Sequence, residues 1–252
     1  MTADIPWAPA FNSVGWTLPA ILTVEHTDRA ADHLRQYFST TKSGLPKFTG
    51  SLFEHFGRGG DKKKVKNQIT AEDLLSLSLL DAPVPAAQVV QFLLPSHTGK
   101  PVDLKQVVTR KFTAHQLPYD LEQINELLAS IPTDVGLSSK KADRHIESGN
   151  QLWVALRRKG FGPARVSKLI ARKRPKLFPI IDSAVEQQLN TDSMGFYENF
   201  HTVLRAEDKA LARHLKSIRT EAAKGSDTQK IADLSTIRVF DILVWMAAND
   251  QA

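Results

Sequence analysis

The sequence contains no cysteine, and this absence removes several chemistries from the 252-residue chain. Disulfide bonds, thiolate nucleophiles, zinc sites with cysteine ligands and iron–sulfur clusters all need cysteine sulfur. No apolar run approaches the roughly 18 residues of a membrane-spanning helix, and the N-terminus lacks the basic and apolar regions of a signal peptide. We therefore expect a cytoplasmic protein that has no membrane partner and holds no cofactor.

The eight histidines give no pattern of metal ligands. None belongs to a His-x-x-x-His pair or an HExxH helix, the spacings that place two imidazoles on one helix face. The sequence therefore predicts no metal site, and the remaining candidate chemistry belongs to carboxylates, lysines and hydroxyl groups.

Apolar residues recur at three- and four-residue intervals over most of the chain, which is the period of an α-helix. Runs of alternating apolar and polar residues with turn signals between them are missing. The sequence therefore predicts a mainly α, multi-helix globular fold. Helices are expected at 28–38, 48–56, from the capping box Thr70–Asp73 to about Asp81, and at 85–94, 121–131, 148–160, 163–173, 181–190, 196–222 with a break, and 228–247.

Three prolines interrupt the first 26 residues, where aromatic residues are scattered without a helical period. We predict an irregular N-terminal arm over 1–26 that wraps over the core. A single helical globular domain is expected over 27–252, with 27–135 and 145–252 as alternative sub-lobes.

Positive charge is concentrated in residues 157–176, the basic block. The chain has 33 Lys and Arg against 27 Asp and Glu, a formal charge of +6. Nine of these bases lie in the block, which has no acid, so the other 24 are outnumbered by the acids. Like charges at i and i+4 repel, so a helical block of one sign suggests a surface for a polyanion, although a patch of ordinary solvated charge is the alternative. The nine bases are Arg157, Arg158, Lys159, Arg165, Lys168, Arg172, Lys173, Arg174 and Lys176.

A turn with two glycines lies inside the basic block. The pattern predicts a helix that ends at Gly160, a turn in which Phe161 plugs into the core, and a second helix that begins with Pro163. Glycines let a backbone approach a phosphate, and the free amides at a helix start attract anions. An ordinary αα-hairpin also favours glycine, but the flanking bases favour DNA. The expected DNA contacts are Gly160, Phe161, Gly162, Pro163, Ala164, Arg165, Lys168, Arg157, Arg158, Lys159, Arg172, Lys173 and Arg174.

This segment resembles the helix-hairpin-helix DNA glycosylase superfamily. In that family a glycine-containing hairpin is followed, past a helix and a proline-containing stretch, by two apolar residues and an aspartate at the next helix start. Here Gly160-Phe161-Gly162 is followed by Ile180-Ile181-Asp182, and Asp182 lies twenty residues after Gly162. The resemblance implies that the Asp182 carboxylate stabilises the oxocarbenium-like sugar of a flipped nucleotide and orients the attacking water. By its local pattern alone, Asp182 is a helix N-cap, and the two roles are compatible.

The chain also departs from that family. Its bifunctional members carry a Schiff-base lysine two residues after the second glycine, where this chain has Ala164, so lyase activity is not expected. The close match covers about a tenth of the chain. Over its whole length the sequence also resembles a family of uncharacterised actinobacterial proteins, which brings no function with it.

Two functions follow from this pattern. The first is a monofunctional DNA glycosylase, a base-excision enzyme of DNA repair in which Asp182 is the catalytic carboxylate. The second is a non-enzymatic, nucleoid-associated DNA-binding module in which Asp182 only caps a helix. A pocket wide enough for a base at Asp182 favours the enzyme, whereas burial of its carboxylate against backbone amides favours the module. A third interpretation, an α protein with an accidental basic face, applies if the bases of 157–176 scatter over several faces.

Overall fold

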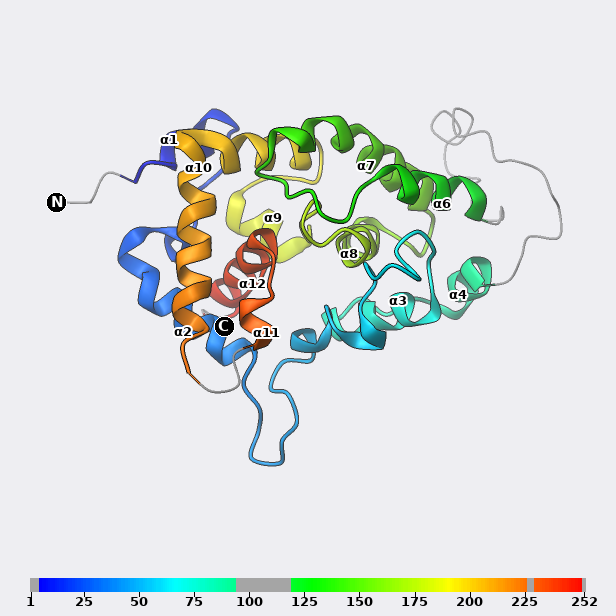
Figure 1. Ribbon diagram of the computed structural model, residues 1–252, viewed down its shortest axis with the longest axis horizontal. Helices are drawn as coiled ribbons and strands as arrows, with labels where there is room; N and C mark the ends of the chain where they lie inside the picture. The colour runs from blue at the N-terminus through cyan, green and yellow to red at the C-terminus, as the bar shows by residue number, and fades with distance from the viewer. Residues whose placement is uncertain (1–4, 94–118, 226–228, 251–252) are drawn as a thin grey trace.

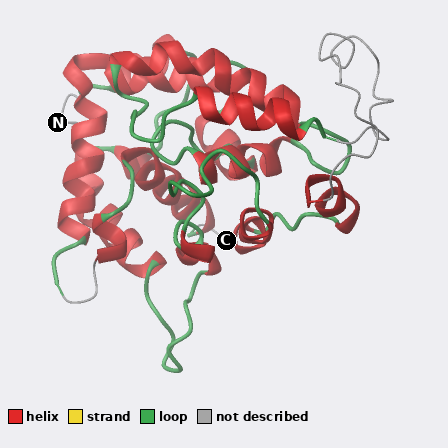
Figure 2. Ribbon diagram, turned by 45° about the vertical axis from the view of Figure 1, so that its right-hand side comes forward, coloured by secondary structure: helices red, strands yellow, loops and turns green. Residues whose placement is uncertain are grey.

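A computed structural model describes residues 5–93, 119–225 and 229–250 of the chain. Helices and loops make up these residues, and no strand occurs among them (Figures 1 and 2). The prediction of a mainly α fold is therefore confirmed. No helix in the described ranges is long and apolar enough to cross a membrane.

The N-terminal arm is more regular than its prolines suggested. Helix α1 (Ala8–Ser13) carries Pro9 in its first turn, where proline removes no helical hydrogen bond. Two single-turn 3₁₀ helices, η1 (Ala20–Leu22) and η2 (Val24–His26), lead into α2 (Thr27–Tyr37), which confirms the helix expected there. Trp7, Phe11 and Trp16 of this arm are buried and belong to the hydrophobic core.

The region between α2 and residue 93 contains short elements. The helix expected over 48–56 is instead two 3₁₀ turns, η3 (Thr49–Leu52) and η4 (Phe56–Arg58), separated by three residues with turn geometry. The capping box of α3 (Ala71–Ser76) is confirmed, because Thr70 and Asp73 each accept the other's backbone amide proton, at 3.3 and 3.1 Å. Helix α3 continues as η5 (Leu77–Leu80) and is followed by α4 (Ala86–Leu93).

The second half of the chain follows its apolar period closely. The long helix α10 contains non-helical residues at 206–209, the expected break. The single helix expected over 228–247 is wrong, because Ser235 accepts the Arg238 amide and starts a new helix there. The elements are α6 (Leu121–Ser130), η7 (Lys140–Ala142), α7 (Asp143–Leu156), α8 (Pro163–Lys173), α9 (Ser183–Leu189), α10 (Phe196–Ala222), α11 (Gln229–Ala232) and α12 (Thr236–Asn249).

Helix α12 packs against α2, α9 and α10 (Figure 1). Its residues from Ile237 to Val244 are all buried, as its almost unbroken apolar sequence predicts. Because α2 and α9 both pack on this helix, residues that are far apart in the sequence meet beside it.

Candidate functional site

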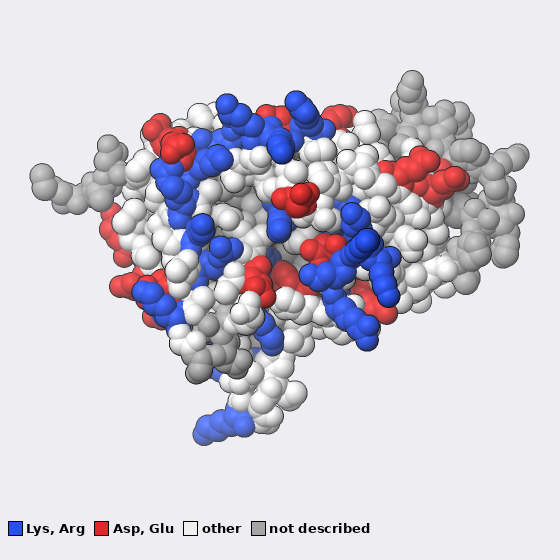
Figure 3. All heavy atoms as spheres, viewed as in Figure 1, with Lys and Arg blue, Asp and Glu red and all other residues white. Residues whose placement is uncertain are grey.

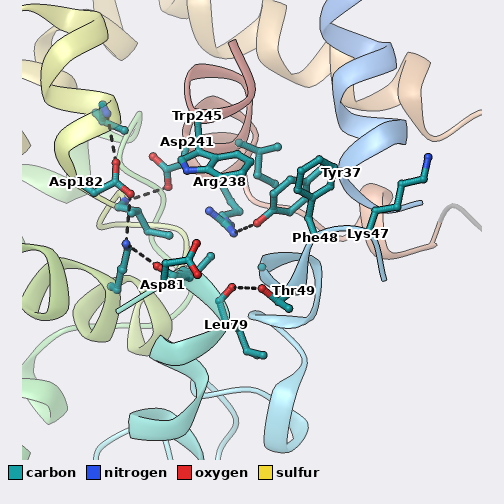
Figure 4. A pocket seen from close by; sticks show the side chains of 16 residues that line it. Tyr37, Lys47, Phe48, Thr49, Leu79, Asp81, Asp182, Arg238, Asp241 and Trp245 are labelled. Atoms are coloured by element: carbon teal, nitrogen blue, oxygen red, sulfur yellow. Dashed lines mark hydrogen bonds and ion pairs between the residues drawn. The ribbon is translucent and has the colours of Figure 1, made fainter. Parts of the chain in front are cut away.

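Asp182 lies in the wall of a pocket of about 260 Å³. Residues of α2, η3, η5, α8, α9 and α12, and of the segments next to them, line this pocket. Figure 4 shows Asp182 and Asp241 on one side of this pocket and Tyr37 and Phe48 on the other, with Arg238 between them. The charged and aromatic residues of its wall are Tyr37, Lys47, Phe48, Asp81, Lys168, Asp182, Arg238, Asp241 and Trp245.

The backbone on both sides of Asp182 is fixed by hydrogen bonds. Asp182 is the N-cap of α9, and its Oδ1 accepts the Val185 amide at 3.3 Å. Ahead of it, the Ile181 amide donates to Ser167 Oγ at 2.7 Å, and the Ile180 amide donates to Asp241 Oδ2 at 3.0 Å. The extended segment that the two isoleucines form is therefore tied to α8 and α12. A carboxylate held from both sides keeps one orientation toward the pocket, which suits a catalytic group.

Lys168 of α8 is the cation nearest to this carboxylate. Its Nζ lies 3.4 Å from Asp182 Oδ2 and donates to the Leu80 carbonyl at 2.9 Å. The side chain is nearly buried, so the structure places this predicted DNA contact inside the pocket. Lys168 can orient Asp182 and a bound ligand, but from there it cannot join an exposed basic surface.

Three aromatic rings form the apolar wall of the pocket. The rings of Tyr37 and Phe48 stack with centroids 5.6 Å apart and an interplanar angle of 9°, and Trp245 meets Phe48 edge-on at 5.8 Å. Arg238 donates to Tyr37 Oη at 3.1 Å and pairs with Glu54 at 2.5 Å, and burial raises the pKa of the tyrosine. An aromatic wall with polar groups opposite it suits a planar ring with polar edges.

The turn between α7 and α8 has a buried Phe161 and a helix that begins at Pro163, as predicted, but α7 ends earlier than expected. Helix α7 ends at Leu156, four residues before the predicted end, because Arg158 and Phe161 pair through both of their backbone hydrogen bonds, at 3.2 and 2.9 Å. Gly160 adopts a φ of +79°, and Phe161 is fully buried. Pro163 is the first residue of α8, as predicted.

Gly162 leaves the N-terminus of α8 open. It is the N-cap residue, has no side chain to cap the first amides, and adopts extended backbone angles. A Cβ added to it would meet no atom within 4 Å. Ala164, in the position of the lysine of bifunctional glycosylases, is half-buried beside this open end.

The basic block does not form one exposed surface, which corrects our prediction. Five of its nine bases are buried, and each of them donates at least one side-chain hydrogen bond to the protein itself. Arg172 pairs with Asp73 at 3.3 Å and donates to the carbonyls of Phe53 and Phe56. Lys173 pairs with the same carboxylate at 2.7 Å. The five buried bases are Arg158, Lys168, Arg172, Lys173 and Arg174.

Arg174 is also almost fully buried, with a relative exposure of 1%. Its guanidinium donates to the carbonyls of Ile131 and Lys66, both at 2.7 Å, and to Asn67 Oδ1 at 3.1 Å. Burial lowers the pKa of Arg174 to about 10. Together Arg172, Lys173 and Arg174 attach the irregular segment 53–67 to the end of α8, so their donors are not available to a phosphate.

Exposed bases remain at the start of the block, at Lys176 at its end, and elsewhere. Arg157 and Lys159 are exposed at the turn, and Arg165 is half-buried with its Nε bonded to the Pro83 carbonyl at 2.7 Å. Figure 3 shows Lys and Arg over the middle and upper edge of one face, with Asp and Glu among them. The segment 58–64 adds four exposed bases, namely Arg58, Lys62, Lys63 and Lys64.

Sequence reasoning missed most of the pocket wall. Trp245, expected as a core residue, is only partly buried and lines the pocket. Arg238 and Asp241 are charged residues three positions apart in an otherwise apolar helix. Because buried charges need polar partners, this pair could have indicated a buried polar site. Tyr37 and Phe48 carried no such signal, because aromatic residues are ordinary core residues. No group of three His, Asp or Glu side chains that could hold a metal occurs within the described part of the chain.

Comparison with known proteins identifies a family without a known activity. Neither the curated proteins nor the solved structures contain a match to the chain. These comparisons therefore give no relative among DNA glycosylases. Residues 30–111 and 101–248 match a family of unknown function designated DUF6308, and because the match spans most of the sequence, the chain belongs to this family.

Proposed function

We propose that this protein is a monofunctional DNA glycosylase of helix-hairpin-helix type, which receives a flipped nucleotide in the Asp182 pocket and hydrolyses its N-glycosidic bond. The observation that carries the proposal is the position of Asp182, a rigidly held carboxylate in the wall of a pocket with an aromatic side. Its volume of about 260 Å³ is just below the range of pockets for drug-sized ligands, so it suits one nucleobase.

In this mechanism Asp182 stabilises positive charge that develops on the sugar as the bond to the base breaks. Water then attacks C1′ from the side of the carboxylate. Lys168, at 3.4 Å, orients the Asp182 carboxylate, and the rings of Tyr37, Phe48 and Trp245 stack on or enclose the base. Ala164 supplies no amine, so the strand with the missing base leaves uncut.

The turn at Gly160–Pro163 is the proposed phosphate contact. The open amides of α8 and the exposed Arg157 and Lys159 support this role. Because five bases of the block are buried, we expect only two or three phosphate contacts from the turn. At a slope of about −0.9 per contact, raising salt fourfold should weaken binding by about 10- to 40-fold.

A panel of duplexes that carry uracil, hypoxanthine, 8-oxoguanine or alkylated purines tests the proposal by base release. Wild-type protein should leave an intact abasic strand that alkali cuts, with no adduct trapped by borohydride. Asp182→Asn should keep DNA affinity and lose base release, whereas Asp28→Asn, an exposed acid outside the pocket, should behave as wild type.

The capping bond from the Val185 amide to Asp182 favours the alternative, a non-enzymatic DNA-binding module. Binding of every duplex by the wild-type protein without release of any base would establish that alternative. A protein that binds no duplex would overturn both.

A further inference from the structure

A hairpin beside the pocket has no role in the proposed function. The chain leaves the pocket wall at Tyr37, the last residue of α2, and returns to it at Lys47. Residues 39–47, the rim hairpin, project from the body of the molecule at the bottom of Figures 1 and 2. Both arms of the rim hairpin therefore start from the wall that we assign to the flipped base.

Hydrogen bonds within the rim hairpin fix its shape. The Lys47 amide donates to the Ser39 carbonyl at 3.0 Å and joins the two arms. At the tip, the Thr41 amide donates to the Leu45 carbonyl at 2.7 Å, and the Leu45 amide donates to Thr41 Oγ1 at 3.2 Å. Gly44 makes the turn with a φ of +80°, which glycine adopts without strain. A segment that is already held in one shape loses little conformational freedom when it binds.

The tip of the rim hairpin presents an apolar side chain to solvent. Leu45 has a relative exposure of 65%, and residues 40–44 before it are exposed as well. Two residues of extended chain span at most about 7 Å, so Leu45 lies close to Lys47, which is exposed and lines the pocket. A single exposed leucine is ordinary on a protein surface. At the end of a rigid projection next to a pocket, however, its side chain can enter a bound partner.

The charge of the rim hairpin indicates the kind of partner. Lys42 lies near its tip and Lys47 at its base, and residues 38–53 contain no Asp or Glu. Both lysines are exposed, and the lysine ion pairs of the described residues involve other lysines. Their ammonium groups are therefore available to phosphates, unlike the buried bases of the basic block. An apolar tip flanked by two cations matches a duplex, in which phosphates flank the stacked bases.

We propose that Leu45 enters the base stack of duplex DNA and fills the space left by the nucleotide that flips into the Asp182 pocket. This inference rests on the proposed glycosylase function. Flipping removes the stacking and pairing of one base. An apolar side chain between base steps replaces part of the lost contact and keeps the duplex kinked. Lys42 and Lys47 bind the phosphates on the two sides of the gap.

This role makes the rim hairpin specific for double-stranded DNA. A single strand has no continuous stack to open, so its bases can reach the pocket without an inserted side chain. Leu45 is a positioning residue, since it touches no reacting atom. Its loss should therefore affect only substrates in which a stack must be opened.

A duplex that carries a tetrahydrofuran abasic site, with 2-aminopurine opposite the gap, tests insertion without any base release. The fluorescence of 2-aminopurine rises when the base loses its stacking partners. Saturating wild-type protein should raise it several-fold. Leu45→Ala should leave it within about twofold of the free duplex while fluorescence anisotropy still reports binding. No rise with bound wild-type protein would overturn the inference.

Two further variants separate insertion from a general loss of structure. Leu45→Met keeps a long apolar side chain and should retain most of the fluorescence rise. Leu75→Ala is the matched control, because this leucine is also exposed, at 58%, and lies outside the pocket and the rim hairpin. It should behave as wild type. Equal losses in Leu75→Ala and Leu45→Ala would overturn the specific role of Leu45.

Base release gives the second readout. Single-turnover rates are measured on duplexes that carry uracil, hypoxanthine, 8-oxoguanine or alkylated purines, and on the same damaged strands alone. Leu45→Ala should lower release from the duplexes by at least about tenfold and change release from the single strands by less than about twofold. Equal losses on the two forms would overturn the inference.

The two readouts distinguish failure of the inference from failure of the proposed function. Wild-type protein that releases a base from duplexes without a 2-aminopurine signal overturns insertion by Leu45 and supports the glycosylase. Wild-type protein that gives the signal, loses it in Leu45→Ala and releases no base overturns the glycosylase and supports insertion by a DNA-binding module.

Discussion

Basic residues lie at both ends of α8, but the two groups of bases have opposite surroundings. At the N-terminal end, Gly162 and Pro163 leave backbone amides open, and the bases beside them reach solvent. At the C-terminal end, Arg172, Lys173 and Arg174 are buried among carbonyl groups of segment 53–67 and the Asp73 carboxylate. A run of Lys and Arg in a sequence therefore indicates many hydrogen-bond donors. Whether these donors bind a ligand or stabilise the fold depends on the groups that surround them in the structure.

The buried bases at the C-terminal end of α8 supply hydrogen-bond donors to the irregular segment 53–67. Residues 53–67 form only short turns, so many of their carbonyl groups lack partners in regular structure. Buried carbonyls need donors, and a guanidinium supplies five in a fixed plane. The helix dipole adds negative potential at the C-terminus of α8, which further favours cations there.

The largest effect should come from breaking the ion pairs at the buried end. Asp73→Asn leaves Arg172 and Lys173 without a paired anion, and such losses cost about 3–5 kcal/mol. We expect a matching fall in unfolding free energy by urea denaturation. Glu72→Gln changes the neighbouring exposed acid and should shift the midpoint far less. Equal shifts for the two variants would show that the buried pairs do not stabilise this end.

Replacement of a single buried guanidinium should have the next largest effect. Arg174→Lys retains the charge but cannot reach the carbonyls of Ile131 and Lys66 together, so we expect a loss of about 2–3 kcal/mol. Arg157→Lys, at the exposed end, should change stability by less than about 0.5 kcal/mol. Thermal unfolding of the two variants compares the ends directly, and similar melting temperatures would contradict the difference between them.

The boundaries of α8 could be predicted because they depend on local signals. Pro163 fits a first helical position, and the apolar period continues to Lys173, where the structure also ends the helix. The interior position of its last bases could not be predicted, since Asp73 and the Phe53 carbonyl lie about a hundred residues earlier in the sequence. The same limit applied to the pocket. Asp182 could be singled out from its neighbours, but its approach to Tyr37 and Asp241 depends on how α2 and α9 pack on α12.

Gly160 and Gly162, near the exposed N-terminal end of α8, should differ in how well they tolerate substitution. Gly160 has a φ of +79°, and a Cβ there would lie 2.6 Å from Gln88 Nε2. Gly160→Ala should therefore cost about 1–2 kcal/mol in unfolding free energy. The double variant with Gln88→Ala, which removes the crowding side chain, separates this contact from backbone strain. Full stability of Gly160→Ala would show that the turn tolerates another conformation.

Gly162 should have the smallest effect on stability and a clear effect on DNA affinity. A serine there adds a Cβ into open space and a hydroxyl that can accept a first-turn amide of α8, so stability should stay equal or rise by a few tenths of a kcal/mol. The same hydroxyl occupies the donors proposed for a phosphate, and the loss of one such charged hydrogen bond should weaken binding by about tenfold. Fluorescence anisotropy with a labelled duplex measures this at fixed salt. Because Gly162→Ser alters no charge, its salt slope should move less than that of Lys159→Ala, which should decrease by about 0.9. Wild-type affinity in a stable Gly162→Ser protein would show that the open end of α8 does not contact DNA.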